Sequence, residues 1–255
     1  MNWAPIWPWL IGQEHEALRI TGVPTLLLEH LVYVAVPVVA AIVIALPIGL
    51  WVGHINKGGT LAINVSNAGR AIPSLGLILI AYIAFEGSLT PVFVTLIAMA
   101  VPPILTNTYV GVREVDPEIR DAAAGMGLSG WQILRRVEIP MAMPVIMAGI
   151  RTSAVQVVAT ATLAAFVGLG GLGRPIFTGL ATSVQFNPDA RTVVVVAVVL
   201  VAVFAIVVEQ SLGVVERLVV PSGLRRLQEQ QRSGAPVNAD AGPAQQTEEQ
   251  STVTV

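Results

Sequence analysis

The sequence predicts an all-α membrane protein, and three observations lead to this fold class. Of its 255 residues, 54% are hydrophobic and only 12% are charged, and the mean hydropathy is +0.74. A soluble domain of this length would carry roughly 25% charged residues. The charges are also unevenly distributed, since residues 21–112 contain four of them and residues 113–138 contain nine. Two apolar blocks therefore flank one short polar loop, as expected of a chain that crosses a bilayer several times.

Uncharged apolar segments of about 20 residues predict the membrane spans, because a helix rises 1.5 Å per residue across a hydrocarbon core of about 30 Å. We predict about five spans, at residues 31–53, 61–85, 87–112, 152–173 and 192–208. The second span is the weakest, since Arg70 and the Pro73-Ser74 step interrupt it. The stretch after Gly171 would add a sixth span if it re-enters the membrane.

The positions of Lys and Arg predict the orientation, because short loops rich in these residues stay in the cytoplasm. The loops at 53–60 and 113–138 and the segment from Arg217 onward fall on one side and hold nine of the 14, so we place the N-terminus outside and the C-terminus in the cytoplasm. Residues 1–24 would form an external interfacial segment, with Trp3, Trp7 and Trp9 at the headgroup level. Residues 25–218 would form the transmembrane domain. Residues 219–255, rich in Gln, Glu, Ser, Ala and Pro, would form a mostly disordered cytoplasmic tail.

The composition argues against several functions. The chain has no cysteine, which excludes cysteine-ligated metals and a cysteine nucleophile. A net charge of −2 lacks the basic excess of a nucleic-acid binder. The three histidines are widely separated, no Ser/His/Asp set lies together in the spans, and no GxxxxGK[ST] phosphate loop occurs. We therefore expect no catalytic residue, metal or cofactor in this chain, and no nucleic-acid partner.

The polar loop carries the signals of a short helix. Asp116 is a suitable N-cap and Pro117 follows at the first helical position. Gly127 is expected to end this helix. The helix would present one smooth apolar face, formed by Ile119, Ala122, Ala123 and Met126. Such a face can bind another protein or merely belong to a solvated connection, and the residues alone leave both interpretations open.

A second short helix is expected directly after the first. Ser129 can cap it at its start, and it would run through residues 130–136 and end at the Ile139-Pro140 step.

The spacing within this loop resembles the EAA signature of ABC-importer permeases. That signature reads Glu-Ala-Ala, three residues, Gly and, nine residues later, Ile-x-Leu-Pro. Here Asp121 replaces the Glu, Val137 the Ile and Ile139 the Leu, and each substitution keeps its chemical class. In the family this loop is the coupling helix that docks onto the ATPase subunit. The resemblance implies that residues 113–140 form the coupling loop, with the matched positions Pro117, Asp121, Ala122, Ala123, Gly127, Ile139 and Pro140.

Further segments are similar to the osmoprotectant subgroup, which imports glycine betaine, carnitine and choline. They are residues 72–75, 111–117, 125–127, 139–151, 159–164 and 168–173, and the similarity covers about residues 29–218. The resemblance implies a multi-pass permease of MetI-like fold in the bacterial cytoplasmic membrane. It also implies as partners two ABC ATPase subunits that bind ATP-Mg, a second permease copy or a homologous permease, an extracytoplasmic substrate-binding protein and membrane lipid.

Arg151 is a charged residue within a predicted span. Counted from a start near Met141, it lies about 15 Å into the hydrocarbon. A charge there costs at least ~2.5 kcal/mol on insertion scales, so Arg151 should face a partner or a cavity. We favour an intramembrane pair, with Glu209 as the candidate partner, over a residue that lines the transport path.

Two other signals are weaker. Gly168, Gly170 and Gly173 spell GxGxxG, but this dinucleotide fingerprint requires a preceding strand, so we interpret the segment as a close-packed turn. An ABC permease for another small solute, such as an amino acid, is the nearest alternative function. A secondary carrier is opposed by the few intramembrane carboxylates and by the lack of an internal repeat.

Overall fold

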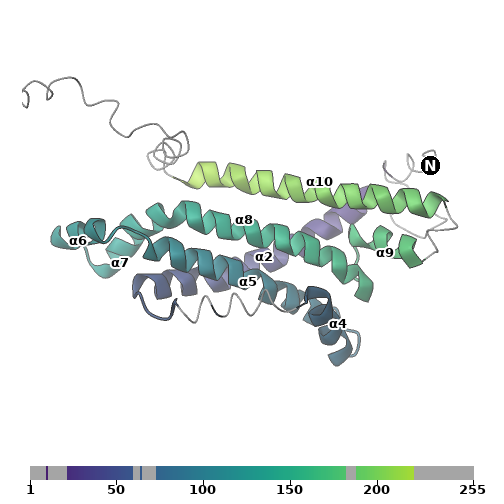
Figure 1. Cartoon of the computed structure of the whole chain (residues 1–255), viewed down its shortest axis with the longest axis horizontal. Helices are drawn as coiled ribbons and strands as arrows, with labels where there is room; N and C mark the ends of the chain where they lie inside the picture. The colour runs from purple at the N-terminus through teal and green to yellow at the C-terminus, as the bar shows by residue number, and fades with distance from the viewer. Residues whose placement is uncertain (1–9, 11–21, 60–63, 65–72, 182–187, 221–255) are drawn as a thin grey trace, which may run out of the picture. The chain divides into compact units, whose positions relative to one another are not determined.

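The computed structural model describes residues 10, 22–59, 64, 73–181 and 188–220, and all regular structure in these ranges is helical (Figure 1). The prediction of an all-α chain is confirmed. The elements are α2 (Val23–His54), α4 (Ser74–Ala84), α5 (Thr90–Arg113), α6 (Pro117–Gly125), α7 (Gly130–Ile133), the π-helical turn η2 (Leu134–Glu138), α8 (Ile139–Leu163), the 3-10 turn η3 (Ala164–Val167), α9 (Gly173–Ala181) and α10 (Pro188–Val219). The tryptophans of the predicted interfacial segment and almost all of the predicted tail lie outside the described residues.

Four helices in the described part of the chain are long and apolar enough to cross a membrane. They are Val23–His54, Thr90–Arg113, Gly130–Val167 and Ala190–Val219. Of the weak span predicted at 61–85, the described part is mainly α4, an apolar helix of 11 residues. The stretch considered as a sixth span forms α9, whose nine residues rise only about 14 Å and cannot cross a bilayer.

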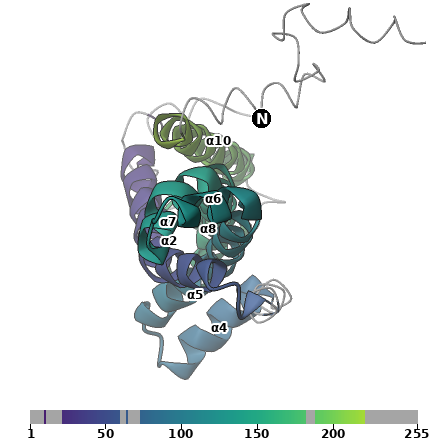
Figure 2. The ribbon, with the colours of Figure 1, turned by 90° about the vertical axis from the view of Figure 1, so that its left-hand side faces the viewer.

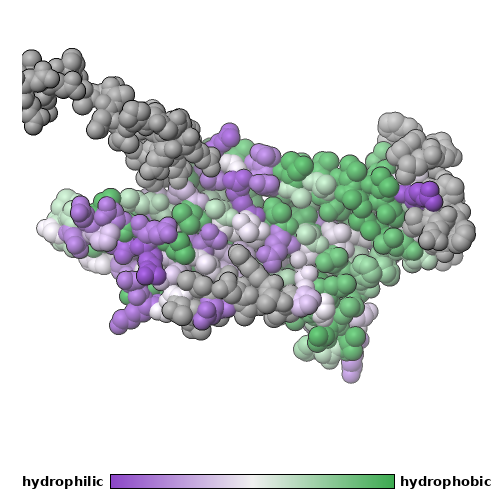
Figure 3. All heavy atoms as spheres, viewed as in Figure 1, coloured by the Kyte–Doolittle hydropathy of each residue, from purple (hydrophilic) through white to green (hydrophobic). Residues whose placement is uncertain are grey.

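The helices α5 and α8 form the centre of the fold. More than half of the residues in their most apolar windows are buried, against fewer than a third in α2 and α10. The helix α2 packs along α5, α5 along α8, and α10 along α8 and α9, while α4 lies on the other side of α5 (Figures 1 and 2). Figure 3 shows a continuous apolar surface over much of α10. The outer faces of α2 and α10 therefore suit contact with lipid.

Glycines allow the central helices to approach closely. Gly49 and Gly53 lie one turn apart on α2, and a Cβ added there would lie 2.7 Å from Cβ of Thr108 and 2.8 Å from Cβ of Val112 on α5. The contact between α5 and α8 is as close, since a Cβ added at Gly149 of α8 would lie 2.6 Å from Cβ of Asn107 on α5. Small residues at such crossings let backbones meet, and the resulting van der Waals packing contributes to helix association in a membrane.

The second loop helix does not end where the sequence predicts. Instead of stopping at the Ile139-Pro140 step, the helix continues through this step into α8. The π-helical turn η2 precedes the step, and Ile139 N–H donates to the Leu134 carbonyl five residues back. Pro140 lies in the first turn of α8, where a missing N–H is tolerated. The proline therefore follows a change of helical pitch rather than a break.

The GxGxxG segment forms a tight turn at the opposite end of α8, as predicted. Gly168 and Gly171 adopt φ angles of +90° and +73°, which favour glycine. The Gly171 N–H donates to Oε2 of Glu29 on α2 at 2.7 Å. A side chain at Gly170 would overlap the same carboxylate, so the glycines let this turn pack directly on α2.

Candidate functional site

The residues of the predicted coupling loop form a helical hairpin at one end of the helices, called the loop end below (Figure 2). The expected N-cap is confirmed, since Oδ1 of Asp116 accepts from the Glu118 N–H at 2.9 Å. Pro117 occupies the first turn, where its missing N–H costs nothing. The helix α6 therefore begins where the local sequence places it.

The end of α6 is a Schellman motif. Gly127 N–H donates to the Ala124 carbonyl at 2.9 Å, and Leu128 N–H donates to the Ala123 carbonyl at 3.2 Å. Gly127 has a φ of +84°, the left-handed conformation that this motif requires. The chain then enters α7, where Oε1 of Gln132 accepts from the Ser129 N–H at 2.8 Å. Both expected helix boundaries at 127–130 are confirmed.

The apolar face predicted on α6 is divided by the tertiary structure. Ala123 is only 2% exposed and points into the protein, whereas Ile119, Ala122 and Met126 lie on the surface. The prediction of one smooth face that includes Ala123 is therefore wrong, because the loop folds back on that side. Trp131 of α7 is 67% exposed and adds to the apolar surface of the hairpin. Sequence reasoning missed Trp131, although a large aromatic residue within a polar loop is a signal that could have indicated it.

A buried ionic group lies between α6 and the membrane helices. Glu138, the last residue of η2, is 1% exposed, and its two carboxylate oxygens contact different partners. Nδ1 of His54, at the end of α2, donates to Oε2 at 2.7 Å, and Nε of Arg120, on α6, lies 3.1 Å from Oε1. Arg120 also donates through Nη2 to the Val112 carbonyl of α5. We call His54, Arg120 and Glu138 the buried junction after its buried carboxylate, since the side chains of His54 and Arg120 are 23% and 21% exposed. Sequence reasoning missed it because Arg120 and His54 lie 18 and 84 positions from Glu138.

The remaining predicted loop residues lie at the same end. Asp121 is exposed on α6, and Ile139 and Pro140 are half-buried in the first turn of α8. The structure thus brings the two halves of the EAA-like signature to the loop end, where Arg120 precedes the first half and Glu138 lies within the second.

Arg151 pairs with two carboxylates of α10. Its Nη2 lies 3.1 Å from Oε1 of Glu209, the partner considered from sequence, and its Nη1 donates to Oε2 of Glu216 at 2.9 Å. Glu216 was not expected, since it lies two turns further along α10. The three side chains are 26–46% exposed, and Arg151 and Glu209 border a pocket of about 380 Å³.

Arg151 lies at the middle of α8, with twelve residues of the helix on either side. Glu209 and Glu216 lie in the half of α10 that is nearer its C-terminal end. The depth of this group of charges in a bilayer stays a prediction.

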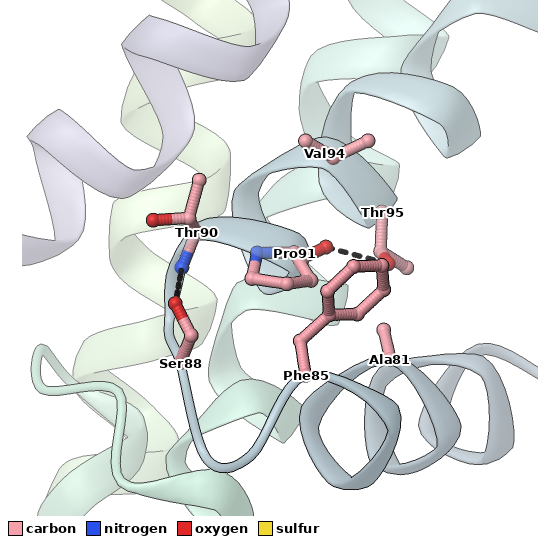
Figure 4. A pocket seen from close by; sticks show the side chains of 7 residues that line it. All are labelled: Ala81, Phe85, Ser88, Thr90, Pro91, Val94 and Thr95. Atoms are coloured by element: carbon pink, nitrogen blue, oxygen red, sulfur yellow. Dashed lines mark hydrogen bonds between the residues drawn. The ribbon is translucent and has the colours of Figure 1, made fainter.

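A second pocket of about 430 Å³ lies between α4 and α5 (Figure 4). Its lining is mostly apolar and holds no charged side chain: Ala81, Phe85, Ser88, Thr90, Pro91, Val94 and Thr95. The Thr95 hydroxyl donates to the Pro91 carbonyl at 2.9 Å, and Ser88 Oγ accepts from the Thr90 N–H at 3.3 Å. Within the described residues, no group of three or more His, Asp or Glu side chains is arranged to hold a metal ion.

The fold and the hairpin define a class: multi-span helical membrane proteins with a structured helical loop at one end. A family described as "binding-protein-dependent transport system inner membrane component" matches residues 16–220. The chain belongs to this family of ABC transporter permease subunits, and it is a multi-pass protein of the inner membrane.

Similar proteins include the glycine betaine/carnitine/choline transport system permease protein of Bacillus subtilis (strain 168), which is 37% identical over 79% of this chain and 90% of that protein. The choline transport system permease protein of the same organism is 36% identical over the same shares. The carnitine transport permease protein of Listeria monocytogenes is 39% identical over 79% of this chain and 89% of that protein.

The fold is also similar to that of a solved structure, an inward-facing MetNI methionine ABC transporter. The TM-score is 0.63 at 21% identity, and the match covers 87% of this chain and all of that one. The expectation of a MetI-like permease fold is confirmed.

Proposed function

We propose that this chain is the transmembrane permease subunit of an ATP-driven ABC importer for osmoprotectants such as glycine betaine, choline or carnitine. The observation that carries the proposal is the α6–α7 hairpin, whose EAA-like spacing and exposed apolar side chains suit docking of an ATPase subunit. The names of the three relatives support the substrate class, because each aligns with this chain over about nine-tenths of its own length.

The chain would contribute a path and a coupling surface, but no chemistry. Two ATPase subunits would bind ATP-Mg, and an external binding protein would deliver the solute. A second permease, either another copy or a homologue, would complete the path. Closure of the ATPase subunits would move α6 and so favour one of two conformations of the helices, since a ligand shifts an equilibrium by its differential affinity for the two states.

Arg151 would act in this assembly as a structural residue. Its guanidinium is shared by Glu209 and Glu216, so the pairs join α8 to α10 along two turns. This geometry supports a structural role over a role in the transport path, because the guanidinium of Arg151 is already paired with two carboxylates.

The test is to purify the tagged chain from its native membranes in mild detergent and to identify the proteins that accompany it. We expect an ATPase subunit and a binding protein, and a second permease species would show a heterodimer. Uptake in proteoliposomes would then be measured with glycine betaine, choline, carnitine and methionine as competitors. A chain that purifies alone, while other ABC complexes stay intact, would contradict the proposal, and competition by methionine alone would contradict the substrate class.

A further inference from the structure

The helix α6 has few side chains that reach the rest of the protein. Of its nine residues, Ala123 alone is buried, and most of the others are exposed. Arg120 is the exception among its charged residues, because its guanidinium extends inward to Glu138 and to the Val112 carbonyl. A force on α6 would therefore reach the membrane helices mainly through the packing of Ala123 and the contacts of Arg120.

Glu138 is arranged to pass that force to two long helices. It is the last residue of η2 and directly precedes α8 in one continuous helix, so a pull on its carboxylate acts directly on α8. Its second oxygen holds His54, the last residue of α2. A carboxylate that is 1% exposed cannot exchange these partners for water without a large penalty, unlike a surface ion pair.

We propose that the buried junction transmits the movement of α6 to α2 and α8, with Glu138 as the positioning residue. This inference rests on the proposed function, since it assumes that a partner moves α6. The junction determines whether α2 and α8 follow α6 as one body.

A purely structural junction and a transmitting junction predict different results. If Glu138 only supports the fold, its replacement lowers the amount of assembled complex, and each surviving complex imports as much solute per ATP as before. If Glu138 transmits movement, assembled complexes continue to hydrolyse ATP but import less solute for each ATP. The ratio of uptake to ATP hydrolysis therefore separates the two roles.

The experiment compares Glu138→Gln with Arg136→Gln, an exposed residue of the same π-helical turn. Both are reconstituted as full complexes with the ATPase and binding protein, and glycine betaine uptake and ATP hydrolysis are measured together. We expect Glu138→Gln to lower the uptake per ATP at least five-fold and Arg136→Gln to leave it unchanged. A wild-type ratio in Glu138→Gln overturns the inference, whereas absence of ATP-driven uptake in the wild type overturns the proposed function instead.

A second variant covers the case in which Glu138→Gln fails to assemble. His54→Gln removes the imidazole that joins α2 to Glu138 and leaves the contact between Arg120 and Glu138 intact. Because the chain has no cysteine, spin labels can be attached at single cysteines introduced at Ala124 of α6 and Trp51 of α2, both exposed. We expect one narrow distance, with and without ATP, in otherwise wild-type complexes and a broadened one in His54→Gln. An unchanged narrow distance in His54→Gln overturns the inference.

Discussion

Replacement of Gly127 by alanine tests whether the hairpin needs its left-handed turn. A Cβ at Gly127 would meet no atom within 4 Å, so neighbouring side chains do not oppose the substitution. The cost arises in the backbone, because a non-glycine residue at a φ of +84° loses about 1–2 kcal/mol. Asparagine enters this conformation more readily than alanine, so Gly127→Asn should cost less.

The magnitude can be converted into an effect on docking. If the ATPase subunit binds only the hairpin with this turn, and the turn is only marginally stable in the free chain, about 1–2 kcal/mol lowers the apparent affinity by at most roughly 5- to 30-fold. Gly125→Ala is the matched control, since a Cβ there also meets nothing within 4 Å and Gly125 lies inside the helix. Alanine at this helical position should be neutral or slightly stabilising.

The assay measures the binding of purified ATPase subunit to each variant in detergent, together with ATP-driven uptake in proteoliposomes. We expect the affinity to fall in the order wild type, Gly127→Asn, Gly127→Ala, with normal amounts of each protein in the membrane. Equal affinities for Gly127→Ala and Gly125→Ala would refute the reasoning, because the two differ only in the backbone conformation that receives the methyl group.

Three further predictions concern the membrane helices. Gly49→Ala should destabilise the α2–α5 contact by about 1–3 kcal/mol through overpacking and lower the melting temperature in detergent, whereas Gly76→Ala, whose Cβ would lie 3.8 Å from its nearest neighbour, should not. Arg151→Leu should lower the amount of protein in the membrane and leave uptake per molecule unchanged, as measured by quantitative blotting and transport. Gly170→Ala should displace the Glu29 carboxylate, remove a charge-assisted hydrogen bond worth about 1.5–3 kcal/mol and lower the melting temperature.

Each of these predictions has a contrary outcome. A wild-type melting temperature for Gly49→Ala would mean that α2 and α5 are not in tight contact at this position. Normal amounts of Arg151→Leu with reduced uptake would favour a pathway role for this residue. Unaltered melting of Gly170→Ala would show that the glycine turn does not depend on Glu29.

The sequence by itself determined the features that are local along the chain. Each of the four long helices overlaps a predicted apolar segment, because a span needs only enough consecutive apolar residues, but only the prediction at 87–112 matches its helix, Thr90–Arg113, closely at both ends. The start and end of α6 followed from Asp116, Pro117 and Gly127, since caps bind backbone groups within three or four residues. The spacing of the EAA-like loop was sufficient to predict the family.

The tertiary structure alone decided which faces and charges meet. A helix turns its side chains by about 100° per residue, so a change of pitch such as η2 redirects every residue that precedes it relative to α8. Residues two positions apart in a helix point to nearly opposite faces, so Glu138 lies inside and Arg136 outside once the packing has chosen the buried face, and the fold-back of the loop buries Ala123. His54 and Arg120 meet Glu138 from distant segments, and no local rule relates their positions. The buried junction is therefore a product of helix register and packing, which sequence patterns of single elements do not contain.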